Sequence, residues 1–231
     1  MNWTVPRMWD GGEVWIIGGG PSIPKQFNIP DKVVQEVVKG SSTPSIYSPY
    51  MEAIHKKHVI GVNVAYLLGD WLDIVFFGDI GFFNRHKEAL ADWPGLRISC
   101  SAEADKYNWV KYLRHDRQHR NGISPNRSMV CWNNNSGAAA ISVAVHTGAK
   151  RIILLGFDMK LDEKNKQHWH NLYGRGEITD ARRLKSLPFD RHMRSFPAIA
   201  EDAKRMGVEI INASPESAIT QFKKVSIKDL L

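Results

Sequence analysis

Runs of consecutive apolar, mostly β-branched residues recur along the chain and predict the strands of a buried sheet. The strongest runs are residues 13–17, 58–62, 73–77, 151–155 and 208–211, with a weaker one at 96–98. The runs are apolar almost throughout and do not alternate with polar residues, which is typical of parallel strands covered on both faces.

Helical stretches lie between these strands. Residues 136–148 start with a Ser cap and end at Gly148, residues 196–207 have Pro197 in the first turn and end at Gly207, and residues 82–93 form a third helix. This alternation predicts an α/β fold: a doubly wound, mostly parallel, Rossmann-like sheet. We expect residues 1–231 to form a single domain of this kind.

Two long stretches, 101–133 and 160–194, do not fit the alternation. Both are polar, basic and aromatic with poor periodicity, and they are too long for simple connections. We expect them to be insertions or a lid over the active face.

Composition narrows the class of protein. The chain has 231 residues, 43% hydrophobic and 24% charged, which argues against a disordered chain, a collagen or a coiled coil. No apolar run approaches the roughly 20 residues that cross a bilayer, and the first residues lack the order of a signal peptide. Cys100 and Cys131 form no CxxC motif. We therefore expect a reducing, cytoplasmic setting without a disulfide framework or a zinc site.

The net charge of +7 is concentrated in one part of the chain. Residues 101–200 hold 17 Lys/Arg against 9 Asp/Glu, whereas residues 1–100 hold 9 against 10 and residues 201–231 hold 5 against 5. A local positive field attracts phosphates, nucleotides, nucleic acid or an acidic glycan. The alternative is a basic face that only keeps the protein soluble.

Small and polar residues collect at the ends of the predicted strands, where ligands of a doubly wound sheet bind. They are Gly18, Gly19, Gly20, Pro21, Ser22, Asn63, Asp79, Asn135, Ser136, Gly137, Gly156 and Asp158. The glycine triplet would let the backbone approach a phosphate, and a helix start at 135–137 would be a second anion cradle. The alternatives are a structural glycine turn, a plain N-cap at Ser136 and an Asx turn at Asp158.

Two common nucleotide-binding classes are disfavoured. Ile23 stands where the dinucleotide fingerprint needs its third glycine, and Asn63 stands where an acidic residue would hold a ribose. The chain also lacks the GxxxxGK[ST] motif of P-loop NTPases.

Six short motifs in a fixed order carry a resemblance to a known family. They are GGGPS at 18–22, the strand ending at Asn63, FFGD at 76–79, NSG at 135–137, ILLGFD at 153–158 and INASPES at 211–217. Over about residues 12–220 this set resembles the MptE-like (DUF115) superfamily, especially its small phage and prophage members. That superfamily contains 6-hydroxymethylpterin diphosphokinases and motility-associated flagellin glycosyltransferases. The set is also similar to bacterial sialyltransferases that use CMP-sialic acid.

The resemblance implies a nucleotide-dependent transferase. The glycine loop, Asn63 and residues 135–137 would hold the donor nucleotide. Where the sialyltransferases place two tyrosines on the donor phosphate, this chain has Lys160 and Lys166, and lysine also suits a phosphate. The family's general base is a histidine shortly before the last long helix, and His192 is the nearest match.

His168 and His170 flank Trp169 in the same basic stretch. In an extended segment alternate residues point the same way, so both imidazoles could face one ligand while Trp169 points into the protein. The pair suits a base with a phosphate partner, or two metal ligands. A further basic–aromatic stretch has Lys111, Arg114, Arg117 and Arg120 at a spacing that predicts one helical face, which would bind a polyanionic acceptor or remain solvated.

Three functions remain open. The first is a glycosyltransferase that moves a sugar from a CMP- or UDP-type nucleotide-sugar donor to an acceptor hydroxyl, with no metal expected. The second is diphosphokinase-like pyrophosphoryl transfer from ATP, with Mg²⁺ on Asp79 and Asp158. The third is a non-catalytic nucleotide- or DNA-binding protein. The expected acceptor is anionic or hydroxyl-bearing, such as a glycan or modified DNA, and residues 160–194 are expected to be mobile until a donor binds.

Overall fold

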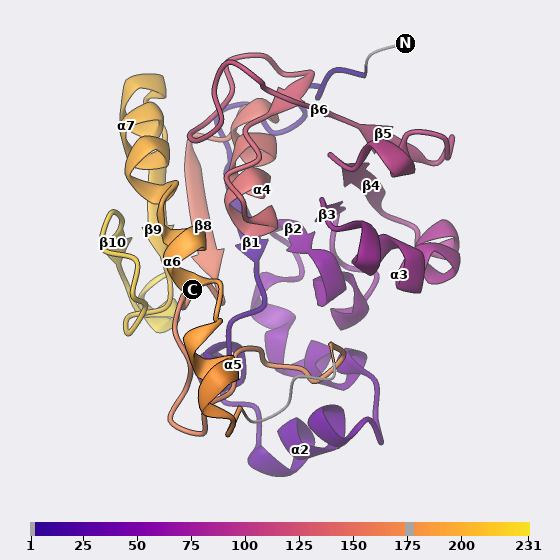
Figure 1. Ribbon diagram of the computed structural model, residues 1–231, viewed down its shortest axis with the longest axis vertical. Coiled ribbons are helices and arrows are strands. Elements are labelled where there is room, and N and C mark those ends of the chain that lie inside the picture. The colour runs from indigo at the N-terminus through magenta and orange to yellow at the C-terminus, as the bar shows by residue number, and fades with distance from the viewer. Residues whose placement is uncertain (1–2, 174–177) are drawn as a thin grey trace.

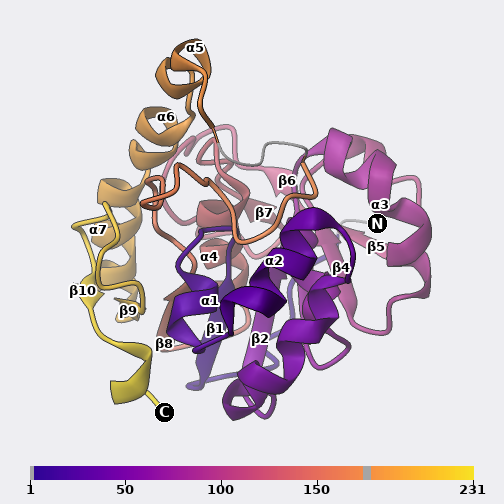
Figure 2. The same cartoon turned by 90° about the horizontal axis from the view of Figure 1, so that it is seen from below.

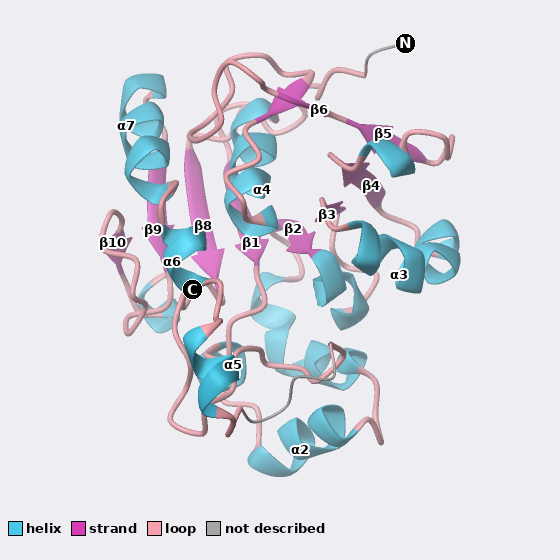
Figure 3. Cartoon of the chain, in the orientation of Figure 1, coloured by secondary structure: helices cyan, strands magenta, loops and turns pink. Residues whose placement is uncertain are grey.

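The computed structural model describes residues 3–173 and 178–231, and its centre is a parallel sheet. Within the described residues the sheet has eight strands in the order β10-β9-β8-β1-β2-β3-β4-β5 (Figures 1 and 3). Their bounds are β1 (Glu13–Ile17), β2 (His58–Val62), β3 (Ile74–Phe77), β4 (Leu96–Ser99), β5 (Val110–Tyr112), β8 (Arg151–Leu155), β9 (Glu209–Asn212) and β10 (Lys223–Lys224). Every pairing in this sheet is parallel, so the predicted fold class is confirmed.

The apolar strands bury both faces of the sheet, as their composition predicts. In β1, Val14 and Ile16 join one hydrophobic core, and Trp15 and Ile17 join the core on the opposite face. All four side chains are 0% exposed. A strand between two cores has no solvent-facing side, which is why its sequence shows no polar alternation.

Helices cover both faces. The described helices are α1 (Ile23–Gln26), α2 (Asp31–Lys39), α3 (Ile80–Asp92), α4 (Ser136–His146), α5 (Ala181–Lys185), α6 (Phe189–Met193) and α7 (Phe196–Met206). The 3-10 segments are η1 (Pro44–Ile54), η2 (Asn63–Leu68), η3 (Ala102–Ala104) and η4 (Ile227–Asp229). Helices α4 and α7 pack into the first core, and α3 and η1 pack into the second.

The structure corrects one helix start and bears out one helix end. The side chain of Asn135, and not that of Ser136, caps α4, because Asn135 Oδ1 accepts the amides of Gly137 and Ala138. Helix α7 ends at Gly207, whose φ of +63° gives the left-handed C-cap that the sequence predicts.

Residues 101–133 contain strand segments and no long helix. Strand β5 extends the sheet edge, and β6 (Arg114–His115) pairs with β7 (Met129–Val130) in a small separate sheet. The predicted helical face of Lys111, Arg114, Arg117 and Arg120 is therefore wrong. Val110 joins the second core and Leu113 the first, so these two side chains point to opposite faces of the sheet, whereas residues three apart on a helix would share one face.

The strand order reverses beside β1. From β1 the chain builds outward through β2 to β5, then returns through α4 to place β8 on the other side of β1. The loops after β1 and β8 consequently leave the same edge of the sheet side by side, at the position where doubly wound folds bind ligands.

Candidate functional site

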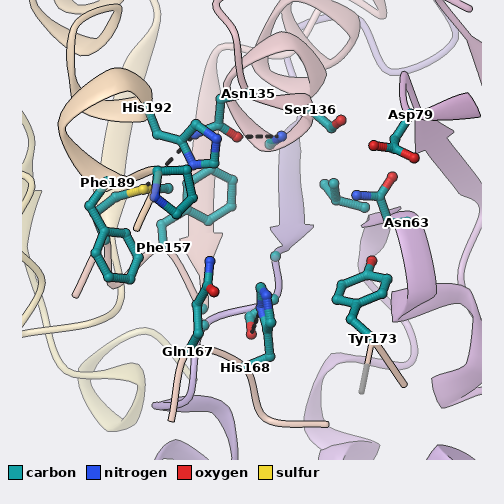
Figure 4. Close-up of a pocket in the computed structure, with 18 of the residues that line it drawn as sticks. Asn63, Asp79, Asn135, Ser136, Phe157, Gln167, His168, Tyr173, Phe189 and His192 are labelled. Carbon is teal, nitrogen blue, oxygen red and sulfur yellow. Dashed lines mark hydrogen bonds between the residues drawn. The ribbon is translucent and has the colours of Figure 1, made fainter. Parts of the chain in front are cut away.

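A cavity of about 530 Å³ opens at this edge of the sheet. Figure 4 shows His192 and Phe189 on one side of it, Asn63 and Tyr173 on the other, and the start of α4 above. The predicted site residues that line it are Gly18, Gly19, Gly20, Asn63, Asp79, Asn135, Ser136, Gly137, Gly156, Asp158, Lys160, His168, His170 and His192. The fold thus gathers most of the predicted set around one space.

Three predicted residues lie elsewhere. Pro21, Ser22 and Lys166 line a neighbouring cavity of about 890 Å³, which α1 and α2 also border. Lys160 lines both cavities, and its ammonium lies 3.7 Å from Glu216 Oε2. Of the two lysines predicted for the donor phosphate, only Lys160 therefore reaches the first cavity.

The glycine loop is held tightly against the loop after β8. Gly18 N donates to Leu155 O and Gly20 N to Gly156 O, both at 2.8 Å. A Cβ on Gly20 would lie 2.1 Å from Asp158 Oδ2 and 2.5 Å from Gly156 O. Close contact between the two loops is thus the main reason for the glycines. Among the described residues, the Gly19 amide is the one N–H of the triplet without an acceptor.

Asp158 fastens the same two loops. Its Oδ2 accepts the Ser22 amide at 3.0 Å, and its side chain is 4% exposed. Burial raises the pKa of this carboxyl above its usual range. Asp79 also forms a hydrogen bond that supports the fold. Its Oδ1 accepts the Phe82 amide at 2.7 Å and caps α3. Both carboxylates that a magnesium site would use are therefore engaged in holding the fold.

Strained backbone surrounds the cavity. Asn63, Asn134 and Met159 line it with φ of +52°, +51° and +50°, the left-handed region that favours glycine. Strain of this kind persists where the surrounding structure enforces it, and it collects at functional sites.

Three polar side chains on the wall have a buried atom without a hydrogen-bond partner among the described residues. The atoms are Asn63 Oδ1, Gln167 Oε1 and His170 Nε2. A buried polar atom left unpaired costs about 1–3 kcal/mol, so natural proteins keep few of them. Three at one cavity indicate a place that a polar ligand or water fills.

The histidine pair has the predicted arrangement. The rings of His168 and His170 stack with centroids 5.2 Å apart and planes inclined by 5°, and both line the cavity. Trp169 lies on the opposite side, is 2% exposed and donates its Nε1 proton to Gly18 O. Residues 167–170 form bends and no strand, so the expected extended segment is wrong, but the bends still bring both imidazoles to the same cavity wall.

His192 lies on α6 at the cavity wall. Burial, and then the charge of Arg191, lowers its pKa to about 4. The ring is therefore neutral at pH 7 and can accept a proton, although it is a weaker base than an exposed histidine.

Sequence reasoning missed Arg85, Trp132 and Tyr173, which also line the cavity. The Arg85 guanidinium lies 5.9 Å from the centre of the Tyr173 ring. Trp132 fills the space beside Gly78, where a Cβ would meet its ring at 2.2 Å. Arg85 lies one turn beyond Phe82 on α3, which also lines the cavity, but nothing in the sequence marks Phe82 as a site residue, so helical spacing alone does not reveal Arg85.

Neither a metal-binding cluster nor a membrane-spanning helix is found among the described residues. Across residues 3–173 and 178–231, no group of three or more His, Cys, Asp or Glu residues could hold a metal ion. In the same part of the chain, no helix has both the length and the apolar character to cross a membrane.

Comparisons with solved structures identify the class of fold. The chain matches the MAf glycosyltransferase of Magnetospirillum magneticum AMB-1 with a TM-score of 0.59 at 12% identity, over 99% of this chain and 36% of that one. The fold is therefore glycosyltransferase-like, and the chain spans about a third of the length of that enzyme.

Two structures of the sialyltransferase CstII from Campylobacter jejuni also match. The complex with cytidine-5'-monophosphate has a TM-score of 0.48 and 14% identity over 93% of this chain and 84% of that one. The complex with CMP-3FNeuAc has a TM-score of 0.49 and 15% identity over 93% and 86%. No protein-family model and no curated protein matches the chain.

Proposed function

We propose that the protein is a nucleotide-dependent glycosyltransferase that moves a sugar from a CMP- or UDP-type donor to an acceptor hydroxyl. The observation that carries the proposal is the polar cavity at the strand-order reversal, whose wall holds three buried polar atoms with no hydrogen-bond partner in the described part of the chain. The glycosyltransferase-like fold and the ordered motifs support it.

The cavity offers the groups that such a transfer needs. The start of α4 faces it, and a helix N-terminus favours a phosphate through its dipole. Lys160 adds a cation near the same place. Together they would stabilise the charge that the nucleotide phosphate gains as the bond from the anomeric carbon to the phosphate oxygen breaks.

A histidine would supply the base. The acceptor hydroxyl loses its proton to a neutral imidazole while its oxygen forms the new bond to the anomeric carbon. His192 and His168 both line the cavity and are the candidates. We also propose that replacing either by Ala slows transfer far more than it weakens nucleotide binding.

A thermal-shift titration with CMP, UDP, ATP and their sugar derivatives tests the proposal. A ligand at 100 times its dissociation constant stabilises the folded state by about 2.7 kcal/mol, which is about 5–10 °C for a chain of this size. We expect at least one CMP or UDP compound to give such a shift without Mg²⁺. No shift with any nucleotide would refute nucleotide dependence, and a shift only with ATP and Mg²⁺ would select the diphosphokinase-like function.

A further inference from the structure

The two stacked histidines of the cavity wall, His168 and His170, form different hydrogen bonds through the same ring atom. In His170, Nδ1 lies 3.2 Å from the backbone nitrogen of Leu172. In His168, Nδ1 lies 3.2 Å from the carbonyl oxygen of Gly19. One partner can only donate and the other can only accept, so the protons of the two neutral rings are placed differently.

For His170 the Leu172 amide fixes the tautomer. An N–H donor requires a lone pair on Nδ1, so the proton of the neutral ring is on Nε2. His170 is 5% exposed, and burial, followed by the nearby rings of His168 and His86, holds its pKa well below the usual range. The ring is therefore neutral at pH 7, with Nδ1 occupied and an N–H at Nε2.

That N–H has no acceptor among the described residues. The His170 ring as a whole contacts the rings of Trp169 and Tyr173, both edge-on, and the stacked ring of His168. None of the hydrogen bonds and ring contacts that His170 forms with described residues involves a carboxylate. A buried donor on the wall of a polar cavity is suited to an acceptor oxygen of whatever fills the cavity.

In His168 the hydrogen bond at Nδ1 has the opposite direction. The Gly19 carbonyl accepts a hydrogen bond, so in the neutral ring Nδ1 carries the proton and Nε2 carries the lone pair. The two stacked rings thus have opposite tautomers, with the proton on Nδ1 in His168 and on Nε2 in His170.

We infer that His170 is a fixed, neutral hydrogen-bond donor to an oxygen of the bound ligand and is not a general base. The sequence offers the pair as a base with a phosphate partner or as two metal ligands, and it does not say which histidine would be the base. The nature of the ligand rests on the proposed function, in which the oxygen belongs to the phosphate of the donor nucleotide. The donor state of His170 rests on the contacts of the ring alone.

Nitrogen-15 NMR of histidine-labelled protein tests the donor state without any substrate. The signals of His170 are assigned by their loss in His170→Gln. We expect an Nε2–H tautomer that remains neutral from pH 5.5 to 8. An Nδ1–H tautomer, or titration near pH 6.5, would overturn the inference.

Nucleotide titrations of matched variants test the ligand contact. Gln can place an amide N–H near the position of Nε2, whereas Leu fills similar space without a donor. We expect His170→Leu to weaken CMP or UDP binding about tenfold or more, and His170→Gln to recover most of that loss. Wild-type affinity in the Leu variant, or equal losses in both variants, would overturn the contact.

A failure of the proposed function can be told apart from a failure of the inference on His170. If the wild-type protein binds neither CMP nor UDP, the proposed function fails, and the NMR spectrum alone then decides the donor state of His170. Circular dichroism of each variant identifies a loss of binding that comes from unfolding.

Discussion

Gly20 shows how one residue can serve the fold and the candidate site together. Its missing side chain lets the loop after β1 touch the loop after β8, and the same contact shapes the cavity wall. A phosphate cradle alone would leave the loop amides available, but those of Gly18 and Gly20 already donate within the fold.

Gly20→Ala should therefore destabilise the protein. The new methyl would meet the backbone oxygen of Gly156 at 2.5 Å, which cannot move without shifting β8. Overpacking of this kind costs about 1–3 kcal/mol, or about 3–10 °C in Tm for a chain of this size. The control is Gly19→Ala, where the nearest atom is in the side chain of His168. Equal Tm values for the two variants in a thermal melt would contradict the argument.

His192 makes stability depend on pH. Its pKa is about 4 in the folded protein and about 6.5 when unfolded, so between these values the unfolded chain binds more protons. Stability should then fall as the pH drops from 6.5 towards 4. Over this pH range the free energy of unfolding of His192→Gln should fall by about 1–2 kcal/mol less than that of the wild type. This figure allows for the partial exposure of the ring. Denaturant melts of both proteins at pH 7 and pH 5 measure this difference. An equal loss of stability in wild type and His192→Gln would contradict the role of His192.

The sequence predicts which polar residues belong to the site better than it predicts how those residues are arranged. Residues that follow a strand, such as Asn63 and Asp158, could be found because a parallel sheet brings strand ends together. Arg85 and Tyr173 could not, because their place on the wall depends on how α3 and the segment after β8 pack. The tautomers of His168 and His170 likewise depend on contacts with the distant Gly19 and the local Leu172.

At the scale of elements, α4 connects stability with binding through its N-cap. Asn135→Ala removes the acceptor for two amides and should cost about 1 kcal/mol. Asn135→Asp keeps the cap but adds a negative charge at the cavity wall. We expect it to retain the wild-type Tm and to bind CMP or UDP several-fold more weakly, as calorimetry would show. Unchanged nucleotide affinity in the Asp variant would place the phosphate away from α4.

The segment 160–194 remains a predicted lid. Figure 2 shows α5 at the extreme end of the molecule, and Arg182, Arg183 and Lys185 on this helix are exposed. Arg175, which belongs to the same prediction, lies outside the described residues. Ser186, Pro188 and Phe189, which follow α5, line the cavity, so a ligand there would contact the segment.

Limited trypsin digestion tests the lid. A bound nucleotide should slow cleavage in 160–194 several-fold, because closure removes the backbone from the protease. Cleavage after Lys223 and Lys224, far along the sheet, serves as the internal control. Identical cutting of the lid with and without every nucleotide would remove closure from the mechanism.

At the scale of the whole molecule, several exposed arginines of residues 101–200 have no acidic partner in the described part of the chain. Among the described residues, no salt bridge includes Arg114, Arg117, Arg120, Arg182 or Arg183. All five are exposed. A field of this kind fits an anionic acceptor, such as an acidic glycan or DNA.

Binding to heparin and to single-stranded DNA should therefore weaken steeply as salt rises from 50 to 200 mM. The double change Arg182→Gln and Arg183→Gln should reduce affinity several-fold. The matched change Lys32→Gln and Lys39→Gln on α2 should have little effect. Absence of binding at low salt would argue for a small, uncharged acceptor.

The overall architecture could be predicted because the strand signal is strong. Residues 13–17, 58–62 and 151–155 match β1, β2 and β8 residue for residue. The edge strands β5 and β10 have only three and two residues, so periodicity cannot reveal them. The spacing of charges in residues 110–120 predicts a helix wrongly, because Val110 and Leu113 pack into cores on opposite faces of the sheet and need an extended backbone.

The purely parallel pairing has a consequence for how the chain reaches its native state. Neighbouring strands such as β1 and β8 are separated by more than 130 residues, and none of the strand pairs in the described sheet can form through a tight hairpin. Loop closure must then precede most of the stabilising contacts, which makes folding slow. During that interval the apolar strands are exposed to other chains, so synthesis at low temperature or with chaperones should raise the yield of native protein.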